Sequence, residues 1–233
     1  MNERPFRIGI VGGMGPMAGV HLQRLIIEAT PATCDQEHVQ VLCFTNPHIP
    51  DRTQSILADG GNAYVAAVRE SIALLERAGV DVLAIPCCTA HARFADLKSG
   101  TTTPLIHMVD TAIAHIIVLQ DPRAHVGLLT TDGALRAEVF MRAAAGTRLE
   151  WVTPMRDEQR VLMSFIARAK SSSPPDVTDL MPFLRALRSR GADAILLGCT
   201  ELSLYATALT HAGFPIVDPL RILAERLVAM ART

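Results

Sequence analysis

The sequence contains one nine-residue pattern twice, and this repeat constrains the fold more than any other feature. Gly79–Cys87 (GVDVLAIPC) aligns without gaps on Gly191–Cys199 (GADAILLGC), at an offset of 112 residues. Further matches lie at offsets of 118 and 111 residues: Gly9 and Gly15 with Gly127 and Gly133, and Pro104–Ile106 with Pro215–Val217. Three nearly constant offsets indicate two copies of one structural unit.

Both halves alternate short apolar runs with amphipathic segments, which is typical of an α/β fold with mainly parallel sheets. The expected strands are Arg7–Val11, Val39–Phe44, Val82–Ile85, Leu105–His107, Val126–Leu129, Leu149–Val152, Ala194–Leu197 and Phe214–Val217. The expected helices cover residues 16–29, 61–79, 133–145, 157–170, 176–190 and 219–232, and residues 45–52 are expected to form a loop.

These elements predict two pseudo-symmetric domains, each with a mainly parallel sheet flanked by helices. The first would cover residues 1–112, completed by residues 213–233 because the last helix returns to it, and the second residues 113–212. Ligands of parallel α/β units bind beyond the carboxyl ends of the strands. The active site is therefore expected in the cleft between the domains.

The composition argues against several classes of partner. The chain of 233 residues has a net charge of -1 and no run of Lys or Arg, so we expect neither a nucleic-acid nor a membrane-surface partner. No apolar run reaches the ~20 residues that span a bilayer, and the N-terminus does not resemble a signal peptide. Five cysteines without metal-ligand spacing predict free thiols, no metal site and a cytoplasmic location.

Cys87 and Cys199 end equivalent strands, and each is expected to precede a helix whose free N–H groups lower the pKa of the thiol. A thiolate and a thiol facing each other can remove a proton from one side of a carbon and return one to the other, which is racemisation or epimerisation. The alternative is a buried cysteine that only packs. Three histidines without paired spacing are expected to make local hydrogen bonds: His48, His91 and His107.

The glycine-rich segment Gly13–Ala18 fits the G-x-G-x-x-A pattern of dinucleotide-binding loops, which would favour a nucleotide-dependent oxidoreductase. Such a site also needs an acidic residue at the end of the second strand, where this chain has Thr45 and Asn46. A tight turn that brings backbone N–H groups close to a small carboxylate is the competing interpretation.

Five segments, in order along the whole chain, resemble the cofactor-independent aspartate/glutamate racemases: Gly12–Pro16, Asn46–Arg52, Pro86–His91, Gly127–Gly133 and Leu197–Leu202. The resemblance implies an isomerase that interconverts the L and D forms of aspartate or glutamate without pyridoxal phosphate or metal, commonly as a homodimer. Cys87 and Cys199 would be the paired acid and base. A related two-cysteine isomerase or a decarboxylase of a small carboxylic acid could use the same scaffold.

The resemblance also implies substrate-binding residues. Arg52 matches an arginine that binds the substrate's side-chain carboxylate, and Lys170 lies where the family has a lysine of similar role. The alternative for both is a solvated surface charge. The remaining predicted contacts are three threonines that could hold the α-carboxylate, Thr89, Thr131 and Thr200, together with Met14, Cys88 and Glu201.

Cys88 is the clear departure from the family pattern, which usually has Asn after the first cysteine. An amide can donate to a carboxylate, whereas a thiol donates poorly. The substitution puts strict aspartate specificity in doubt and leaves the two-cysteine chemistry untouched.

Overall fold

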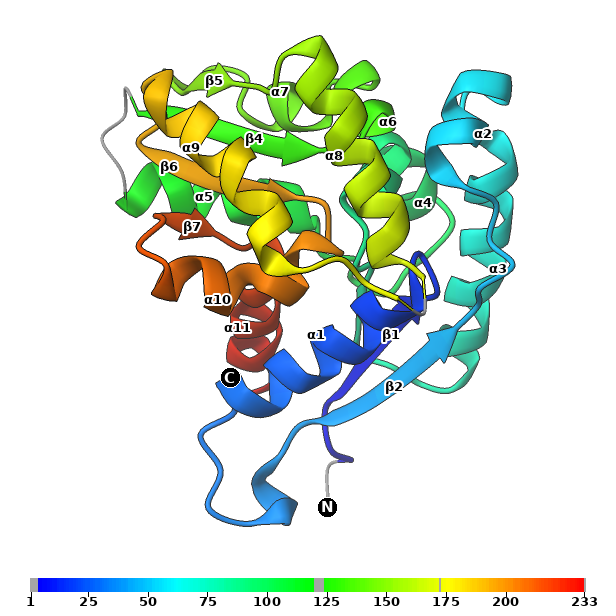
Figure 1. The fold of residues 1–233 in the computed structure, drawn as a ribbon. Coiled ribbons are helices and arrows are strands. Elements are labelled where there is room, and N and C mark those ends of the chain that lie inside the picture. The colour runs from blue at the N-terminus through cyan, green and yellow to red at the C-terminus, as the bar shows by residue number, and fades with distance from the viewer. Residues whose placement is uncertain (1–3, 120–123, 172, 233) are drawn as a thin grey trace.

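Two parallel β-sheets, one from each half of the chain, form the frame of the protein (Figure 1). The computed structural model describes residues 4–119, 124–171 and 173–232. The first sheet has the strand order β2-β1-β3 and the second β5-β4-β6-β7, with every pairing parallel. The predicted α/β class with two helix-flanked parallel sheets is confirmed.

The first half contains β1 (Arg7–Gly12), α1 (Pro16–Ala29), η1 (Asp35–Glu37), β2 (Gln40–Thr45), α2 (Arg52–Asp59), α3 (Asn62–Arg77), β3 (Val82–Ala84), η2 (Cys88–Arg93), α4 (Phe94–Lys98) and α5 (Met108–Leu119), where η denotes a 3-10 helix. The second half contains β4 (His125–Thr130), α6 (Asp132–Arg136), α7 (Val139–Ala143), β5 (Glu150–Val152), α8 (Arg156–Ala169), η3 (Val177–Leu180), α9 (Met181–Ser189), β6 (Ala194–Gly198), η4 (Leu202–Tyr205), α10 (Ala206–His211), β7 (Ile216–Val217) and α11 (Pro219–Ala231).

The repeated Gly-x-Asp pattern has a structural cause. The carboxylate of Asp81 accepts a hydrogen bond from the backbone N–H of Arg7 at 2.7 Å, and Asp193 accepts one from the N–H of His125 at 2.8 Å. Each aspartate lies just before a strand and binds the first residue of the neighbouring strand. The same contact in both halves confirms that the repeat is structural.

The strand registers agree with the repeat. Ile8 lies opposite Val82 in the first sheet, and Val126 lies opposite Ala194 in the second. These pairs are separated by the same offsets, 118 and 112, that the sequence shows. Equivalent strands therefore end at equivalent places, which brings the two cysteines to the same edge of their sheets.

One apolar core joins the two halves. It contains inward side chains of both sheets, such as Ile8, Ile10, Val126 and Leu128, packed with α1, α5 and α11. A second cluster lies between the first sheet and α3, and a third between the second sheet and helices α8 and α9. Apolar residues alternate between clusters along β1 because successive side chains of a strand point to opposite faces. Within the described ranges, none of the helices is long and apolar enough to cross a membrane.

The end of the chain is shared between the halves. Strand β7 pairs with β6 and so belongs to the second sheet, although the sequence grouped residues 213–233 with the first unit. Helix α11 packs against α1 and α5, as the expected return of the last helix requires. The domain boundary at residue 112 stays a prediction.

Three expectations about local structure were wrong. The predicted strand Leu105–His107 forms only an isolated bridge between Leu105 and Leu83, because Pro104 lacks an N–H and α5 begins at Met108. The predicted helix over residues 133–145 is broken into α6 and α7 at Glu138, whose φ is 52°. The predicted loop ends one residue early, since Arg52 already begins α2.

Candidate active site

The carboxyl ends of the strands surround one small cavity between the two halves. It is lined by all ten site residues that the sequence predicts: Met14, Arg52, Cys87, Cys88, Thr89, Thr131, Lys170, Cys199, Thr200 and Glu201. Asp51 and Thr53 also line it and were missed, although their position on either side of Arg52 could have indicated them. The space inside is about 10 Å³, which is room for about one water molecule. The site is therefore closed around its own side chains.

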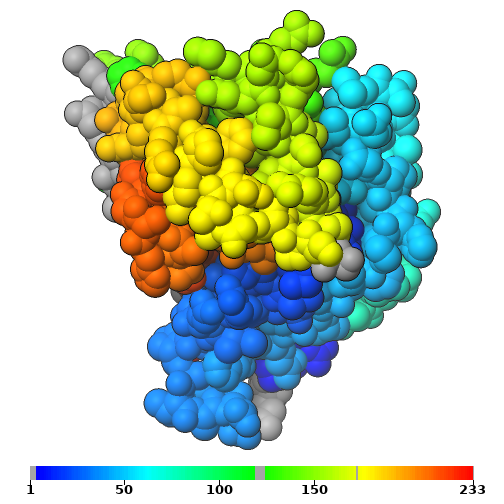
Figure 2. Space-filling model, in the orientation of Figure 1, coloured from blue at the N-terminus to red at the C-terminus, as the bar shows by residue number. Residues whose placement is uncertain are grey.

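The closure is visible from outside. In Figure 2 the yellow segments of α8 and α9 lie directly against the blue segment of α1. A Cβ added to Gly15, just before α1, would lie 3.9 Å from Cγ of Lys170, which follows α8. These two ends of the halves meet over the cavity.

Both candidate thiols are free and buried, each with 5% exposure. Cys87 follows β3 and Cys199 follows β6, as expected, but 3-10 helices come after them where full α-helices were predicted. Burial and the nearby charge of Glu201 raise the pKa of Cys199 well above its ordinary value. The expectation that a helix N-terminus lowers this pKa was wrong, because desolvation disfavours the thiolate.

Glu201 pairs with the Cys199 thiol. The Sγ atom of Cys199 donates to Oε2 of Glu201 at 3.0 Å, and Oε1 accepts the backbone N–H of Gly15 at 3.1 Å. The glutamate is 4% exposed, so this pair is shielded from water. A carboxylate in this position can accept the thiol proton. The structure thus places Glu201 beside a thiol, whereas the sequence analysis predicted a substrate contact.

Arg52 is a buried cation without a counter-ion. Its side chain is 7% exposed, and Nη1 donates to the carbonyls of Ile49 and Pro50 at 3.4 and 3.1 Å. Its Nε has no hydrogen-bond partner, and no carboxylate of the described residues forms an ion pair with it. A buried charge is stable only when it is paired, so this guanidinium is suited to an anionic ligand. The solvated alternative for Arg52 is inconsistent with this burial.

Lys170 lies at the mouth of the cavity and remains partly in solvent. Burial disfavours its charged form, but the negative charge of Glu201, and then that of the two thiols, outweighs this effect and raises its pKa. Lys170 therefore carries a positive charge at neutral pH. Together with Arg52 it makes the cavity cationic on the side away from Glu201's bond to Gly15.

Threonine hydroxyls join the two halves across the site. The Oγ1 atoms of Thr89 and Thr131 are 2.8 Å apart, and Thr200 donates to the carbonyl of Pro86 at 3.1 Å. Each bond links a loop of one half to a loop of the other. A substrate carboxylate that binds these hydroxyls must replace the bonds, so we expect the halves to separate when substrate enters.

Cys88 supplies neither a charge nor a strong donor. It is 1% exposed, and burial, followed by the neighbouring Cys87, raises the pKa of its thiol well above the ordinary value. It packs in the apolar core that joins the halves. Met14, also 1% exposed, provides an apolar wall.

The glycine-rich loop is explained by close backbone contact. Gly13 has a φ of +104°, and a Cβ there would lie 2.1 Å from the carbonyl oxygen of Asn46. The N–H of Asn46 also donates to the carbonyl of Gly12 at 3.2 Å. Since the N–H of Gly15 binds the protein's own Glu201, the tight-turn interpretation accounts for this loop better than a dinucleotide site.

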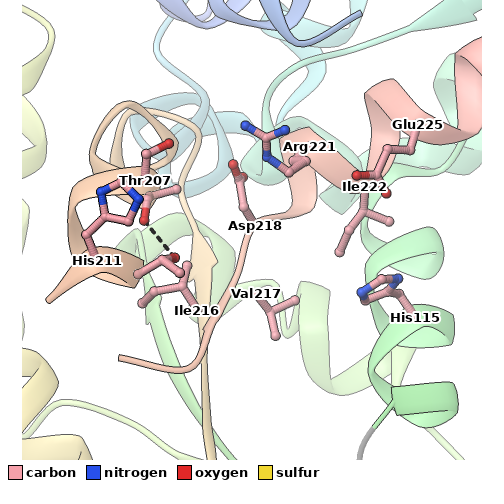
Figure 3. Close-up of a pocket in the computed structure, with 11 residues that line it drawn as sticks. His115, Thr207, His211, Ile216, Val217, Asp218, Arg221, Ile222 and Glu225 are labelled. Carbon is pink, nitrogen blue, oxygen red and sulfur yellow. Dashed lines mark hydrogen bonds between the residues drawn. The ribbon is translucent and has the colours of Figure 1, made fainter. Parts of the chain in front are cut away.

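A larger, open cavity of about 350 Å³ lies elsewhere, between α5, α10 and α11 (Figure 3). Its buried acid, Asp218, accepts the hydroxyl of Ser203 at 2.6 Å and the N–H of Leu220 at 3.0 Å, so it serves as the cap of α11. Arg221 at its edge pairs with Glu28 at 3.3 Å. Because these groups are already used in structural contacts, the small cavity with the thiols is the better candidate.

Known proteins resemble this chain over nearly its full length. The sequence profile described as Asp/Glu/Hydantoin racemase matches residues 11–227. The broad specificity amino-acid racemase RacX of Bacillus subtilis is 24% identical over 230 residues, which cover 95% of this chain and 96% of that protein.

Solved structures show the same arrangement. Picrophilus torridus aspartate racemase superposes with a TM-score of 0.85 at 26% identity, covering 97% of this chain and 94% of its own. An aspartate racemase homologue from Pyrococcus horikoshii has the same fold, with a TM-score of 0.75 at 21% identity over 97% of this chain and 99% of its own. The chain belongs to the Asp/Glu/Hydantoin racemase family.

Proposed function

We propose that the protein is an isomerase that interconverts the L and D forms of an acidic amino acid by a two-base thiol mechanism. The observation that carries the proposal is the pair Cys87 and Cys199. They occupy equivalent positions of a structural repeat, and both line one closed cavity between the halves. Membership in a racemase family supports the same reaction class.

The reaction needs one thiolate and one thiol. In one direction the Cys199 thiol gives its proton to Glu201, and the resulting thiolate removes the proton from Cα of the substrate. The electron pair left on Cα is delocalised into the α-carboxylate, and the Cys87 thiol donates a proton to the opposite face. Cys87 is then the thiolate, ready to act on the other enantiomer. The 3.0 Å contact between Cys199 and Glu201 provides the first step.

The charges in the site favour an acidic substrate. A dicarboxylate brings one more negative charge than a neutral amino acid, and the buried guanidinium of Arg52 can hold a carboxylate through two hydrogen bonds. Lys170 adds a second positive charge. Aspartate and glutamate fit this pattern. The relative from Bacillus subtilis has broad specificity, and the apolar Cys88 in this chain supports tolerance of more than one side chain.

Two finer properties belong to the same proposal. All five cysteines are free, which supports a reducing cytoplasmic environment. The family resemblance supports a homodimer. Light scattering after size-exclusion chromatography measures the assembly directly: a mass near twice the 25.2 kDa of the chain is expected, and a monomer would contradict it.

Isotope exchange tests the reaction. The protein is incubated with L-aspartate or L-glutamate in D2O, and NMR and optical rotation follow deuterium at Cα and loss of chirality. We expect both changes together. If neither occurs with either amino acid or with other acidic amino acids, the proposal is wrong.

Single cysteine variants test the mechanism. Cys87→Ser and Cys199→Ser should each stop racemisation, because one face of Cα then lacks its acid or base. Cys34→Ser is the control, since this cysteine is exposed and outside the cavity. A related one-base isomerase or a decarboxylase would keep turnover in one of the two active-site variants.

A further inference from the structure

His91 joins the loop of Cys87 to the beginning of helix α5. It lies four residues after the cysteine, in η2, and is 5% exposed. Its Nδ1 atom is 2.9 Å from the carbonyl oxygen of Cys87, and its Nε2 atom accepts the backbone N–H of Met108 at 3.1 Å. One imidazole ring therefore connects a proposed proton-transfer residue to the first residue of α5.

These two contacts determine the protonation of the ring. A backbone N–H can only donate, so Nε2 is the unprotonated nitrogen and the proton of the neutral ring is on Nδ1. Nδ1 then donates to the Cys87 carbonyl. Burial, assisted by the neighbouring His107, lowers the pKa of His91 to about 3, which keeps the ring neutral at physiological pH. Both nitrogens are occupied, so His91 is not a spare acid or base.

Aromatic contacts hold the ring in this orientation. Phe94 stacks on it with a centroid distance of 5.6 Å and an angle of 8° between the planes. His107 contacts it edge-on at 4.8 Å. Rotation of the ring would break these contacts together with both hydrogen bonds, so the connection between the Cys87 loop and α5 is rigid.

The second half makes a related connection at the equivalent position. Ser203 lies four residues after Cys199 and donates to Asp218, which accepts the N–H of Leu220 at the start of α11. His91 and Ser203 are 112 residues apart, as are Met108 and Leu220. Both halves thus tie the cysteine loop to the following helix, but only His91 binds the carbonyl of the cysteine itself.

We propose that His91 is a positioning residue that fixes the backbone of Cys87, and with it the thiol, relative to α5. The inference rests on the proposed function, in which Cys87 exchanges a proton with Cα of the substrate. Proton transfer requires reacting atoms about 3–3.5 Å apart, and a displacement of about 1 Å can cost about 100-fold in rate. Without its bonds to His91, the Cys87 loop loses its connection to α5.

His91→Phe tests this role because it keeps the aromatic ring and removes both hydrogen bonds. A cavity of about 290 Å³ borders His91, so water can reach the N–H of Met108 in the variant. We expect kcat to fall about 10–100-fold with KM changed by less than about 3-fold, since substrate binding is untouched. His91→Gln, which has both a donor and an acceptor, should recover part of kcat.

His107→Phe is the matched control. Nδ1 of His107 accepts the N–H of Asp110 at 3.0 Å in the same helix, and the ring packs on His91, but it makes no hydrogen bond to the Cys87 loop. This variant loses a similar helix bond and should keep kcat within about 3-fold of the wild type. An equal loss in both variants would show that α5 stability, and not the position of Cys87, controls the rate.

Thiol alkylation gives a measurement that needs no substrate. Peptide mass spectrometry follows the separate rates at which iodoacetamide modifies Cys87 and Cys199. His91→Phe should change the Cys87 rate several-fold and leave Cys199 unchanged. Wild-type rates at Cys87, or equal changes at both thiols, would overturn the proposal. If the wild type racemises nothing, the proposed function fails while this test of positioning still stands. Should His91→Phe not fold, His91→Asn, too short to join both groups, takes its place in both measurements.

Discussion

Acidification should destabilise the protein through two buried histidines. Burial lowers the pKa of His91 to about 3 and that of His107 to about 4, from an ordinary value of 6.5. In the unfolded chain both rings regain their ordinary pKa and bind protons more readily. Their contribution to stability is therefore complete above about pH 6.5 and is lost as the pH falls toward the folded-state values.

The magnitude follows from the protons bound at pH 5. There each unfolded histidine is about 97% protonated and each folded one is nearly neutral, so each lowers the free energy of unfolding by about 2 kcal/mol relative to pH 7.5. This figure changes little if either folded-state pKa differs by half a unit, because pH 5 lies above both. The two rings together remove about 4 kcal/mol, a large part of the ~5–15 kcal/mol that stabilises a typical protein.

Urea unfolding at pH 7.5 and pH 5 measures the effect. Between these pH values the wild type should lose about 2 kcal/mol more than His91→Phe, which has no ring to protonate at this position. His48→Phe, which removes an exposed histidine, is the control and should behave like the wild type. Equal losses in the wild type and His91→Phe would refute the argument that His91 is buried as a neutral ring.

Other substitutions test the backbone contacts and the cations. Gly13→Ala places a Cβ 2.1 Å from the Asn46 carbonyl at a positive φ, so we expect a loss of about 3 kcal/mol or more by urea unfolding, and a smaller loss would show that the loop can relax. Asp81→Asn and Asp193→Asn should each cost about 1 kcal/mol, and unequal costs would contradict the equivalence of the two contacts. Arg52→Ala should raise KM for an acidic substrate about 30-fold or more, whereas an unchanged KM would remove Arg52 from the substrate site.

The parts of the fold that were predictable depend on local patterns that repeat. Gly-x-Asp before an apolar strand could be recognised in both halves because each aspartate binds the first residue of the neighbouring strand. The bridge at Leu105 and the break at Glu138 were missed because they depend on neighbouring chain segments. A strand is stable only when its partner offers matching N–H and C=O groups, and propensity does not report this.

The site was predictable in membership and less so in contacts. All ten predicted residues line the cavity because the motifs fix which loops meet at the strand ends. The partner of Glu201 was not predictable, since its distance from Cys199 depends on the local turn of the chain. The pKa of Cys199 was predicted in the wrong direction for a related reason: the sequence shows the position of a thiol along a helix but not the depth of its burial.

The pair of Cys199 and Glu201 allows the base function of the glutamate to be separated from its effect on thiol acidity. Burial and then the charge of Glu201 raise the pKa of Cys199, so Glu201→Gln should lower that pKa, which the pH dependence of alkylation measures. A more acidic thiol alone would raise activity at neutral pH. If Glu201 accepts the thiol proton, kcat/KM should instead fall about 10²–10⁴-fold. The fall must be equal for both enantiomers, because the equilibrium constant of racemisation is one. A lowered pKa with unchanged or increased kcat/KM would show that Glu201 only tunes the thiol and takes no part in proton transfer.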